Sequence, residues 1–338
     1  MAEIGGWVAA GFEAVRDAFT EDPRGGSALT VLRDGTPVVE LWEGWRDTAR
    51  TRPWEADTRV NVYSVGKPVI ALAVVLLAER GLLDLDDPVA RHWPDFASGA
   101  SVRQALAHTA GLPVFPVSRP ASAWAEWDVL CADLAAAEPL WPPGTVAAEH
   151  ALTYGHLLGE IVRRVDGRPP ARFVAEEIAE PYGLDFGFGG GSRCAELEYD
   201  ASDWPERNLG DPGSLHARAV SNPAGARDLA VVNSPLWRNA CIPAVNLHAS
   251  ATSIARFYAV PAAARLAVTQ FTGVDRFIGD EVVWGLGVQI EPDGSWGMGG
   301  LGGNCGWADP AAGHTIGYVT RRLGDFAAVD RIDAALKS

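Results

Sequence analysis

Tyr63-Ser-Val-Gly-Lys67 stands at the head of a long apolar run, and the interpretation of the whole chain starts from it. A helix beginning here places Ser64 and Lys67 one turn apart on the same face. A serine hydroxyl attacks a substrate when a base takes its proton, and a lysine serves as that base once burial lowers its pKa. Lys67 and Lys337 are the only lysines. A capping serine before a helix with Pro68 in its first turn is the alternative explanation.

Composition narrows the class of protein. The 338 residues are 48% hydrophobic, which is enough for a large core, and the net charge of −15 argues against nucleic acid or anionic membranes as partners. The longest apolar run, residues 69–78, is far shorter than the roughly 20 residues that span a bilayer. The first residues lack a basic segment, so we expect a cytoplasmic enzyme. No metal-ligand or nucleotide motif occurs, so we expect no metal and no cofactor.

Hydrophobic spacing predicts the secondary structure. A helix is expected from Trp7 to Phe19, and Asp34-Gly35 between two strand-like runs predicts a hairpin. Arg321 and Arg322 are expected to be solvent-exposed at the end of a strand. The remaining expected elements are helices over 68–81, 101–108, 124–137 and 153–166, ordered loops over 183–243, and strands over 282–290, 297–307 and 314–320.

Further stretches resemble one known family. The chain is similar to class C β-lactamases and family VIII carboxylesterases over roughly residues 10–322. The stretches that carry this resemblance are Val60-Asn-Val-Tyr-Ser-Val-Gly-Lys67, Leu77-Ala-Glu-Arg-Gly-Leu-Leu-Asp-Leu-Asp-Asp-Pro-Val89, Trp93-Pro-Asp-Phe96, Ser101-Val-Arg-Gln-Ala-Leu-Ala-His-Thr-Ala-Gly-Leu-Pro113, Pro143-Gly144, His150-Ala-Leu-Thr-Tyr-Gly155 and Gly302-Gly303.

The resemblance implies an α+β fold. A twisted antiparallel sheet flanked by terminal helices is expected, interrupted by an inserted all-helical domain, with the active site between them. The boundaries that we predict are residues 1–60 and 246–338 for the sheet domain and residues 61–245 for the mostly helical domain. Ser64 would be the nucleophile and Lys67 its proton partner.

The chain departs from the family pattern at its second element, where a tyrosine normally shares proton transfer with the lysine. Glu149 occupies that position, and Tyr154 comes too late and is interpreted as a helix packing residue. A glutamate in contact with Lys67 would favour the charged lysine and weaken it as a base. Three roles are open for Glu149: general base, ligand of a substrate amine, or a charge that turns outward or inactivates the site.

The third family element, usually Lys-Thr-Gly or His-x-Gly, matches Met298-Gly299-Gly300. The missing cation argues against recognition of a penicillin carboxylate. By the same match, the backbone amides of Ser64 and Leu301 would form the oxyanion hole. The glycines alternatively mark only a bulged edge strand.

Two histidines are further candidates for substrate contact. His150 follows Glu149 directly, and His248 faces the cleft on the family pattern, although a hydrogen-bonded structural role suits His150 equally well. The prediction is therefore a serine hydrolase or acyltransferase that forms an acyl-Ser64 intermediate from a small ester, amide or thioester, with secondary metabolism as a setting. A catalytically silent binding protein of the same fold is the alternative.

Overall fold

A single antiparallel sheet organises the computed structural model, which describes residues 4–191 and 194–338. The two ends of the chain meet in its centre, where Tyr318 lies opposite Leu29 in register. Within the described residues the sheet has nine strands, in the spatial order β1 (Gly5–Val8), β3 (Thr36–Gly44), β2 (Gly26–Arg33), β13 (His314–Thr320), β12 (Asn304–Asp309), β11 (Trp296–Gly300), β10 (Gln289–Ile290), β9 (Glu281–Trp284) and β8 (Phe271–Val274).

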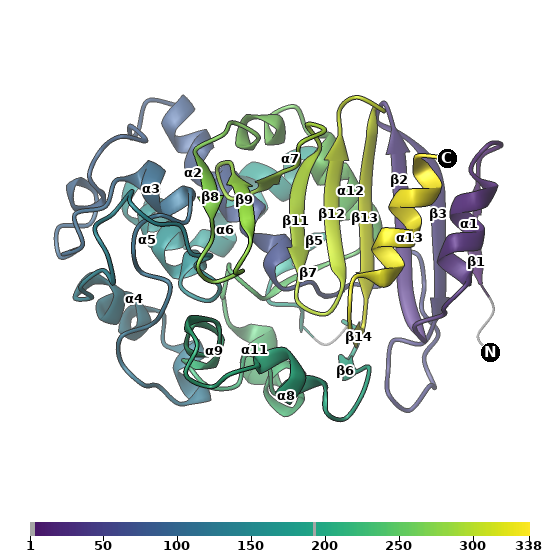
Figure 1. Ribbon diagram of the computed structural model, residues 1–338, viewed down its shortest axis with the longest axis horizontal. Coiled ribbons are helices and arrows are strands. Elements are labelled where there is room, and N and C mark those ends of the chain that lie inside the picture. The colour runs from purple at the N-terminus through teal and green to yellow at the C-terminus, as the bar shows by residue number, and fades with distance from the viewer. Residues whose placement is uncertain (1–3, 192–193) are drawn as a thin grey trace.

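Helices cover both faces of this sheet (Figure 1). The terminal helices α1 (Glu13–Thr20) and α13 (Ala327–Leu336) pack on one face through a cluster that includes Phe19, Val31 and Ile332. On the other face lies α12 (Ala251–Ala259), which approaches so closely that a Cβ at Gly317 would meet the Ala251 carbonyl oxygen at 2.1 Å. The expected sheet flanked by terminal helices is confirmed.

Most of the remaining helices lie beside the β8–β9 side of the sheet, and a few lie below its lower edge in the view of Figure 1. Helix α2 (Lys67–Glu79) is buried on nearly every side, as its almost unbroken apolar sequence predicts, and it packs against α5 (Tyr154–Asp166). The other helices are α3 (Val102–Leu106), α4 (Trp127–Ala135), α6 (Pro170–Val174), α7 (Glu180–Tyr182), α8 (Trp204–Leu209), α9 (Leu215–Ser221), α10 (Leu229–Val232) and α11 (Pro235–Asn239). The predicted division at residues 60–61 and 245–246 stays a prediction.

Helix α5 contains a buried carboxylate with several partners. The Glu160 side chain is 1% exposed and accepts hydrogen bonds from Arg163 Nε at 2.7 Å, Arg164 Nε at 2.7 Å and Trp127 Nε1 at 2.9 Å. Burial opposes ionisation of this carboxyl, but the hydrogen bonds outweigh burial and hold its pKa below the ordinary value.

Two small sheets join distant segments of the chain. Strand β7 (Leu247–Ala249) pairs with β4 (Val60–Asn61) and β5 (Phe186–Phe188), directly before the nucleophile stretch. Strand β14 (Arg322–Leu323) continues from β13 and pairs in parallel with β6 (Glu198–Tyr199). The loop that contains β6 is thereby attached to the end of the central sheet.

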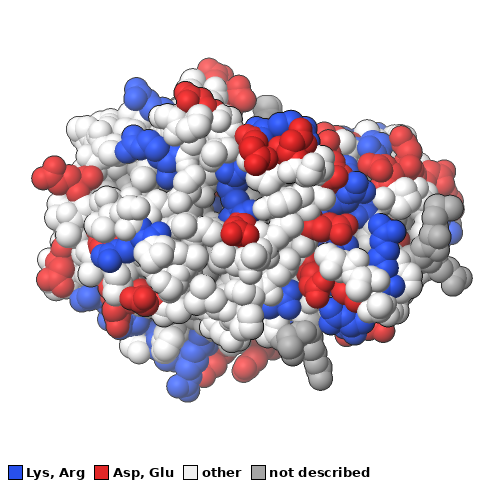
Figure 2. Space-filling model, turned by 90° about the horizontal axis from the view of Figure 1, so that it is seen from below, with Lys and Arg blue, Asp and Glu red and all other residues white. Residues whose placement is uncertain are grey.

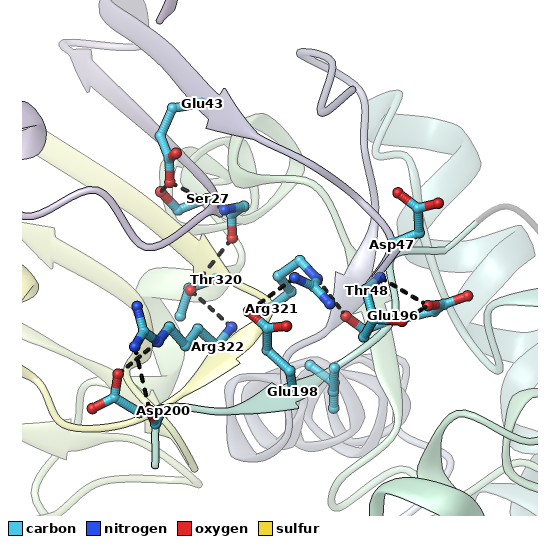
Figure 3. Close-up of polar contacts among 12 residues, drawn as sticks. Ser27, Glu43, Asp47, Thr48, Glu196, Glu198, Asp200, Thr320, Arg321 and Arg322 are labelled. Atoms are coloured by element: carbon cyan, nitrogen blue, oxygen red, sulfur yellow. Dashed lines mark hydrogen bonds and ion pairs between the residues drawn. The ribbon is translucent and has the colours of Figure 1, made fainter. Parts of the chain in front are cut away.

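Ion pairs reinforce this attachment (Figure 3). Arg321 Nε donates to the Glu196 carbonyl at 2.7 Å, and Arg321 Nη1 lies 3.0 Å from Glu198 Oε1. Its neighbour Arg322 pairs with Asp200 at 2.6 Å. The expectation that both arginines are solvated at a strand end was wrong for Arg321, whose side chain is 1% exposed. The two basic residues thus pair with the carboxylates of Glu198 and Asp200, whereas Glu196 takes part through its backbone carbonyl.

The structure corrects four further predictions. Residues 282–290 form two strands, β9 and β10, and the expected loops over 183–243 contain the four short helices α8 to α11. The run from Trp7 to Phe19 is not one helix, because its first residues form β1 on the edge of the sheet, where Trp7 lies opposite Glu40. Residues 297–307 are not one strand, because Gly302 and Gly303 adopt φ values of 87° and 99° and turn the chain between β11 and β12. The hairpin at Asp34-Gly35 is confirmed.

Acidic and basic side chains are intermixed on the face shown in Figure 2, which displays no broad basic patch. In the part of the chain that the structure describes, no helix has the length and apolar character needed to cross a membrane. The described residues also contain no group of three His, Cys, Asp or Glu side chains arranged to hold a metal ion.

Candidate active site

Ser64 begins a single turn of 3-10 helix, Ser64–Gly66, that leads directly into α2. The preceding residue, Tyr63, has φ 50° and ψ −127°, a strained conformation for a side chain of this size. Hydrogen bonds on both sides hold it, from the Val62 amide to the Leu247 carbonyl at 2.9 Å and from the Tyr63 hydroxyl to the Ala226 carbonyl at 3.3 Å. The strained turn presents the Ser64 side chain to a cavity.

Three predicted catalytic residues meet at this cavity: Ser64 and Glu149 line it, and the fully buried Lys67 contacts both of them from behind. Lys67 Nζ lies 2.6 Å from Ser64 Oγ and 2.8 Å from Glu149 Oε1. Ser64 Oγ lies 3.4 Å from the same glutamate oxygen. Glu149 therefore faces inward, and the possibility that it turns outward does not describe its position. A continuous path for protons runs from the serine through the lysine to the glutamate.

Burial and the contact with Glu149 act in opposite directions on the pKa of Lys67. Its side chain is 0% exposed, and this loss of hydration lowers its pKa, while the charge and hydrogen bond of Glu149 act in the opposite direction. Burial is the larger effect, so the pKa of Lys67 stays below its ordinary value despite the 2.8 Å contact. The lysine can therefore exchange its proton with the two groups beside it.

Glu149 is positioned by a residue that the sequence did not point out. Asp275 is fully buried and its Oδ1 accepts a hydrogen bond from the Glu149 amide at 3.2 Å. The same carboxylate accepts hydrogen bonds from the Phe277 and Ile278 amides and from Trp284 Nε1. Burial raises the pKa of Asp275. Four donors on one buried carboxylate fix the loop that holds Glu149.

Strand β11 ends beside the nucleophile. A Cβ at Gly300 would meet the Val62 carbonyl oxygen at 2.2 Å, so only glycine allows this approach. Leu301 follows at the start of the turn and lines the same cavity as Ser64. Among the described residues, neither the Ser64 amide nor the Leu301 amide donates a hydrogen bond in a loop, turn or cap. Both are available to a substrate oxygen, as an oxyanion hole requires.

Met298 and Gly299 also line the cavity, although Met298 is 2% exposed and packs chiefly against Ala147 and Trp284. Strand β11 is an internal strand, but its pairing with β10 ends at Gly297. Residues 298–300 therefore present a free backbone edge on the side where β10 stops. Tyr154 packs in α5 as predicted, with its hydroxyl donating to the Leu106 carbonyl at 2.9 Å.

The structure does not bring the two predicted histidines into the cavity. His150 is fully buried, with Nδ1 at 2.9 Å from the Ala148 carbonyl and Nε2 accepting the Leu112 amide at 3.3 Å, and burial lowers its pKa to about 4. His248 is 1% exposed, with Nδ1 at 2.8 Å from the Asn246 carbonyl. Both rings are neutral, and their nitrogens contact nearby backbone groups and not the cavity.

The cavity itself has a volume of about 250 Å³. Sequence reasoning did not assign its remaining walls to the site. Some of them belong to the stretches quoted above, and the others come from segments without a sequence motif. These additional lining residues are Tyr63, Ala151, Leu152, His216, Val220, Ala226, Arg227, Val245, Phe277, Gln289 and Phe326.

Comparisons with known proteins agree with this site and fold. The chain is 33% identical to esterase/beta-lactamase LipL of Mycobacterium tuberculosis, over 88% of this chain and 77% of the relative. A crystal structure of a family VIII carboxylesterase superimposes with TM-score 0.87 at 30% identity, and a penicillin-binding protein homolog from Caulobacter crescentus with 0.85 at 32%, each covering 99% of both chains. The Beta-lactamase family model matches residues 13–337, and the chain therefore belongs to the beta-lactamase family.

Proposed function

We propose that this protein is an esterase that hydrolyses small carboxylic esters through an acyl-Ser64 intermediate. The observation that carries the proposal is the chain of contacts from Ser64 Oγ through Lys67 Nζ to Glu149 Oε1, at 2.6 Å and 2.8 Å, on the wall of a cavity. Relatives named as esterases support the same chemistry.

Acylation uses the three residues together. Lys67 first passes a proton to Glu149, and the neutral amine then takes the proton of Ser64 Oγ as this oxygen attacks the ester carbonyl. The lysine remains an ammonium, and the glutamic acid carries the net proton. The Ser64 and Leu301 amides stabilise the tetrahedral oxyanion. Collapse of this intermediate releases the alcohol, which takes a proton back along the same path.

Deacylation reverses these roles with water. Glu149, ionised again, withdraws a proton from a water molecule through the Lys67 contact, and the hydroxide attacks the acyl carbon. Ser64 Oγ leaves and recovers its proton. In this scheme Glu149 takes the place of the usual tyrosine as general acid and base, and it is the terminal proton acceptor in both half-reactions.

The walls of the cavity suit esters better than β-lactams. Met298 replaces the cation that would pair with a penicillin carboxylate, so we propose that β-lactams are poor substrates. The volume of about 250 Å³ suits a short acyl group. We further propose transfer of the acyl group to an alcohol or amine in place of water, in a tailoring step of secondary metabolism, because the site has exchanged two usual family residues. Product analysis with an added alcohol tests the transfer.

Labelling by a fluorophosphonate tests the proposal against a silent binding protein. Intact-protein mass spectrometry should show one adduct in the wild type and in Ser118→Ala, which alters an exposed serine away from the cavity. Ser64→Ala should show none and should hydrolyse no p-nitrophenyl butyrate. Absence of any adduct or turnover in the wild type would leave the silent binding protein as the better description.

A further inference from the structure

His216 and Arg227 line the cavity that contains Ser64 and belong to the segment attached through β6. The backbone places Arg227 firmly, because its carbonyl accepts the Tyr199 hydroxyl at 2.5 Å. The carbonyl of the neighbouring Ala226 accepts the hydroxyl of Tyr63, the residue before the nucleophile. The backbone that carries this cationic side chain is thus held at the site by hydrogen bonds from two tyrosines.

Arg227 has no acidic partner among the residues that the structure describes. The two arginines that are buried among the described residues each have one: Arg24 lies 3.0 Å from Asp325, and Arg321 lies 3.0 Å from Glu198. The Arg227 guanidinium donates through Nη2 to the Pro205 carbonyl, but its Nε is buried with no acceptor. Glu206 attracts it without forming an ion pair. A half-buried guanidinium with unused donors is unfavourable unless an anion joins it.

His216 offers a second donor. Its ring stacks on Phe277 with the centroids 4.7 Å apart, and its Nε2 is buried without a partner in the described chain. Burial lowers the pKa of His216, so the ring is neutral near pH 7 and Nε2 donates one hydrogen bond when it holds the proton. The two side chains present complementary donors on one wall.

The charges in the cavity also favour an anion. Lys67 and Glu149 form a pair whose charges cancel, so Arg227 leaves the cavity with a net positive charge although the whole chain carries −15. Screening limits distant charges, whereas a partly buried cation acts strongly on a group inside the same cavity. Met298 supplies no charge, which makes Arg227 the cation available to the substrate among the described lining residues.

We propose that Arg227 and His216 form a carboxylate-binding subsite and that the preferred substrates are esters carrying a carboxylate. This proposal rests on the proposed esterase function. The guanidinium supplies a charge-assisted hydrogen bond, and the imidazole orients the second carboxylate oxygen. The subsite thereby restores, from a different element, the anion recognition that the exchange at Met298 removed.

Matched ester pairs test the subsite from both ends of the substrate. Mono-p-nitrophenyl adipate carries its carboxylate on the acyl side, and para-butyryloxybenzoate carries it on the leaving group; the methyl ester of each is the neutral control. In the wild type, kcat/KM for at least one anionic ester should exceed that of its neutral partner roughly tenfold or more, the usual effect of one hydrogen bond to a charged group.

Variants then assign the preference to Arg227. Arg227→Gln should lose the anionic-to-neutral ratio, whereas Arg218→Gln, which removes an exposed arginine from the same helix as His216, should keep it. Arg227→Lys keeps the charge but not the forked donors and should give an intermediate ratio, which also decides the question if Arg227→Gln unfolds.

Two results would overturn the subsite. One is a wild-type ratio near one for both ester pairs, and the other is a preference that survives unchanged in the folded Arg227 variants. Failure of the esterase function looks different, because then neither neutral nor anionic esters turn over and Ser64 forms no adduct. His216→Phe should reduce the ratio less than Arg227→Gln does, because it removes a neutral donor.

Discussion

Replacing Glu149 by glutamine tests the proton path most directly. Glutamine keeps the size of the side chain and its contact with Lys67 but accepts no proton. If Glu149 is the terminal acceptor, kcat/KM should fall by about 10²–10⁴, the usual contribution of a general base. That loss corresponds to roughly 3–5 kcal/mol of transition-state stabilisation.

A second effect of the same change acts on Lys67. At an effective dielectric constant of about 20, two charges about 4 Å apart interact by about 4 kcal/mol, or roughly three pKa units. Removing Glu149 leaves burial as the dominant influence, so the pKa of Lys67 should fall further. The residual activity should then come from neutral lysine acting as the base, with the acidic limb of the pH–rate profile displaced to lower pH.

The assay is steady-state hydrolysis of p-nitrophenyl butyrate across the pH range, with a burst measurement for the acyl-enzyme. Because Lys67 can lose its proton, the free energy of unfolding should drop by less than the roughly 3–5 kcal/mol typical of breaking a buried ion pair. Wild-type kcat/KM in Glu149→Gln, within about threefold across the pH range, would refute the role of Glu149.

Three other changes have defined outcomes. Gly300→Ala should lower kcat by about 10²–10³ by moving the Leu301 amide, while Gly213→Ala, whose Cβ would meet nothing closer than 3.5 Å, should not; equal kinetics would contradict the close approach of β11. Asp275→Ala leaves four donors unpaired and should cost about 3 kcal/mol or more in urea unfolding, with lower kcat; a smaller change in both would remove its positioning role. The carboxyl of Glu160 has a lower pKa folded than unfolded, so its stabilisation is complete above about pH 4 and disappears as pH falls towards the folded pKa. Glu160→Gln should weaken this acid dependence, and identical unfolding curves from about pH 7 to about pH 3 would argue against it.

The sequence predicted the parts of the site that depend on local spacing. Ser64 and Lys67 are separated by one helical turn in any helix, so their contact at 2.6 Å follows from position alone. Glu149 was found because neighbouring stretches fixed its alignment. The hairpin at Asp34-Gly35 likewise follows from a local turn signal.

The parts that depend on tertiary contacts were not predictable in this way. Arg227 and His216 lie in a segment of short helices and turns without periodicity, and only the fold brings them to Ser64. Asp275 belongs to no sequence motif, and its role is recognised only when the fold brings its four hydrogen-bond donors together. Trp7 was assigned to a helix from the sequence because the edge strand β1 shows no clear alternation of apolar and polar residues. His150 was predicted to contact substrate because it follows Glu149, yet its ring nitrogens bond the backbone of Leu112 and Ala148.

The parallel pairing of β6 with β14 separates the two tasks of the enzyme. Proton transfer depends on α2 and on the loop that Asp275 fixes. The wall with Arg227 is instead attached to the end of the central sheet through Tyr199 and the ion pair between Arg321 and Glu198. Apart from Ala226, whose carbonyl accepts the Tyr63 hydroxyl beside the nucleophile, substitutions between residues 200 and 230 should therefore change the wall with Arg227 more than the proton path. Laboratory evolution for a new substrate should be concentrated in that loop, with the sheet-side anchors left unchanged.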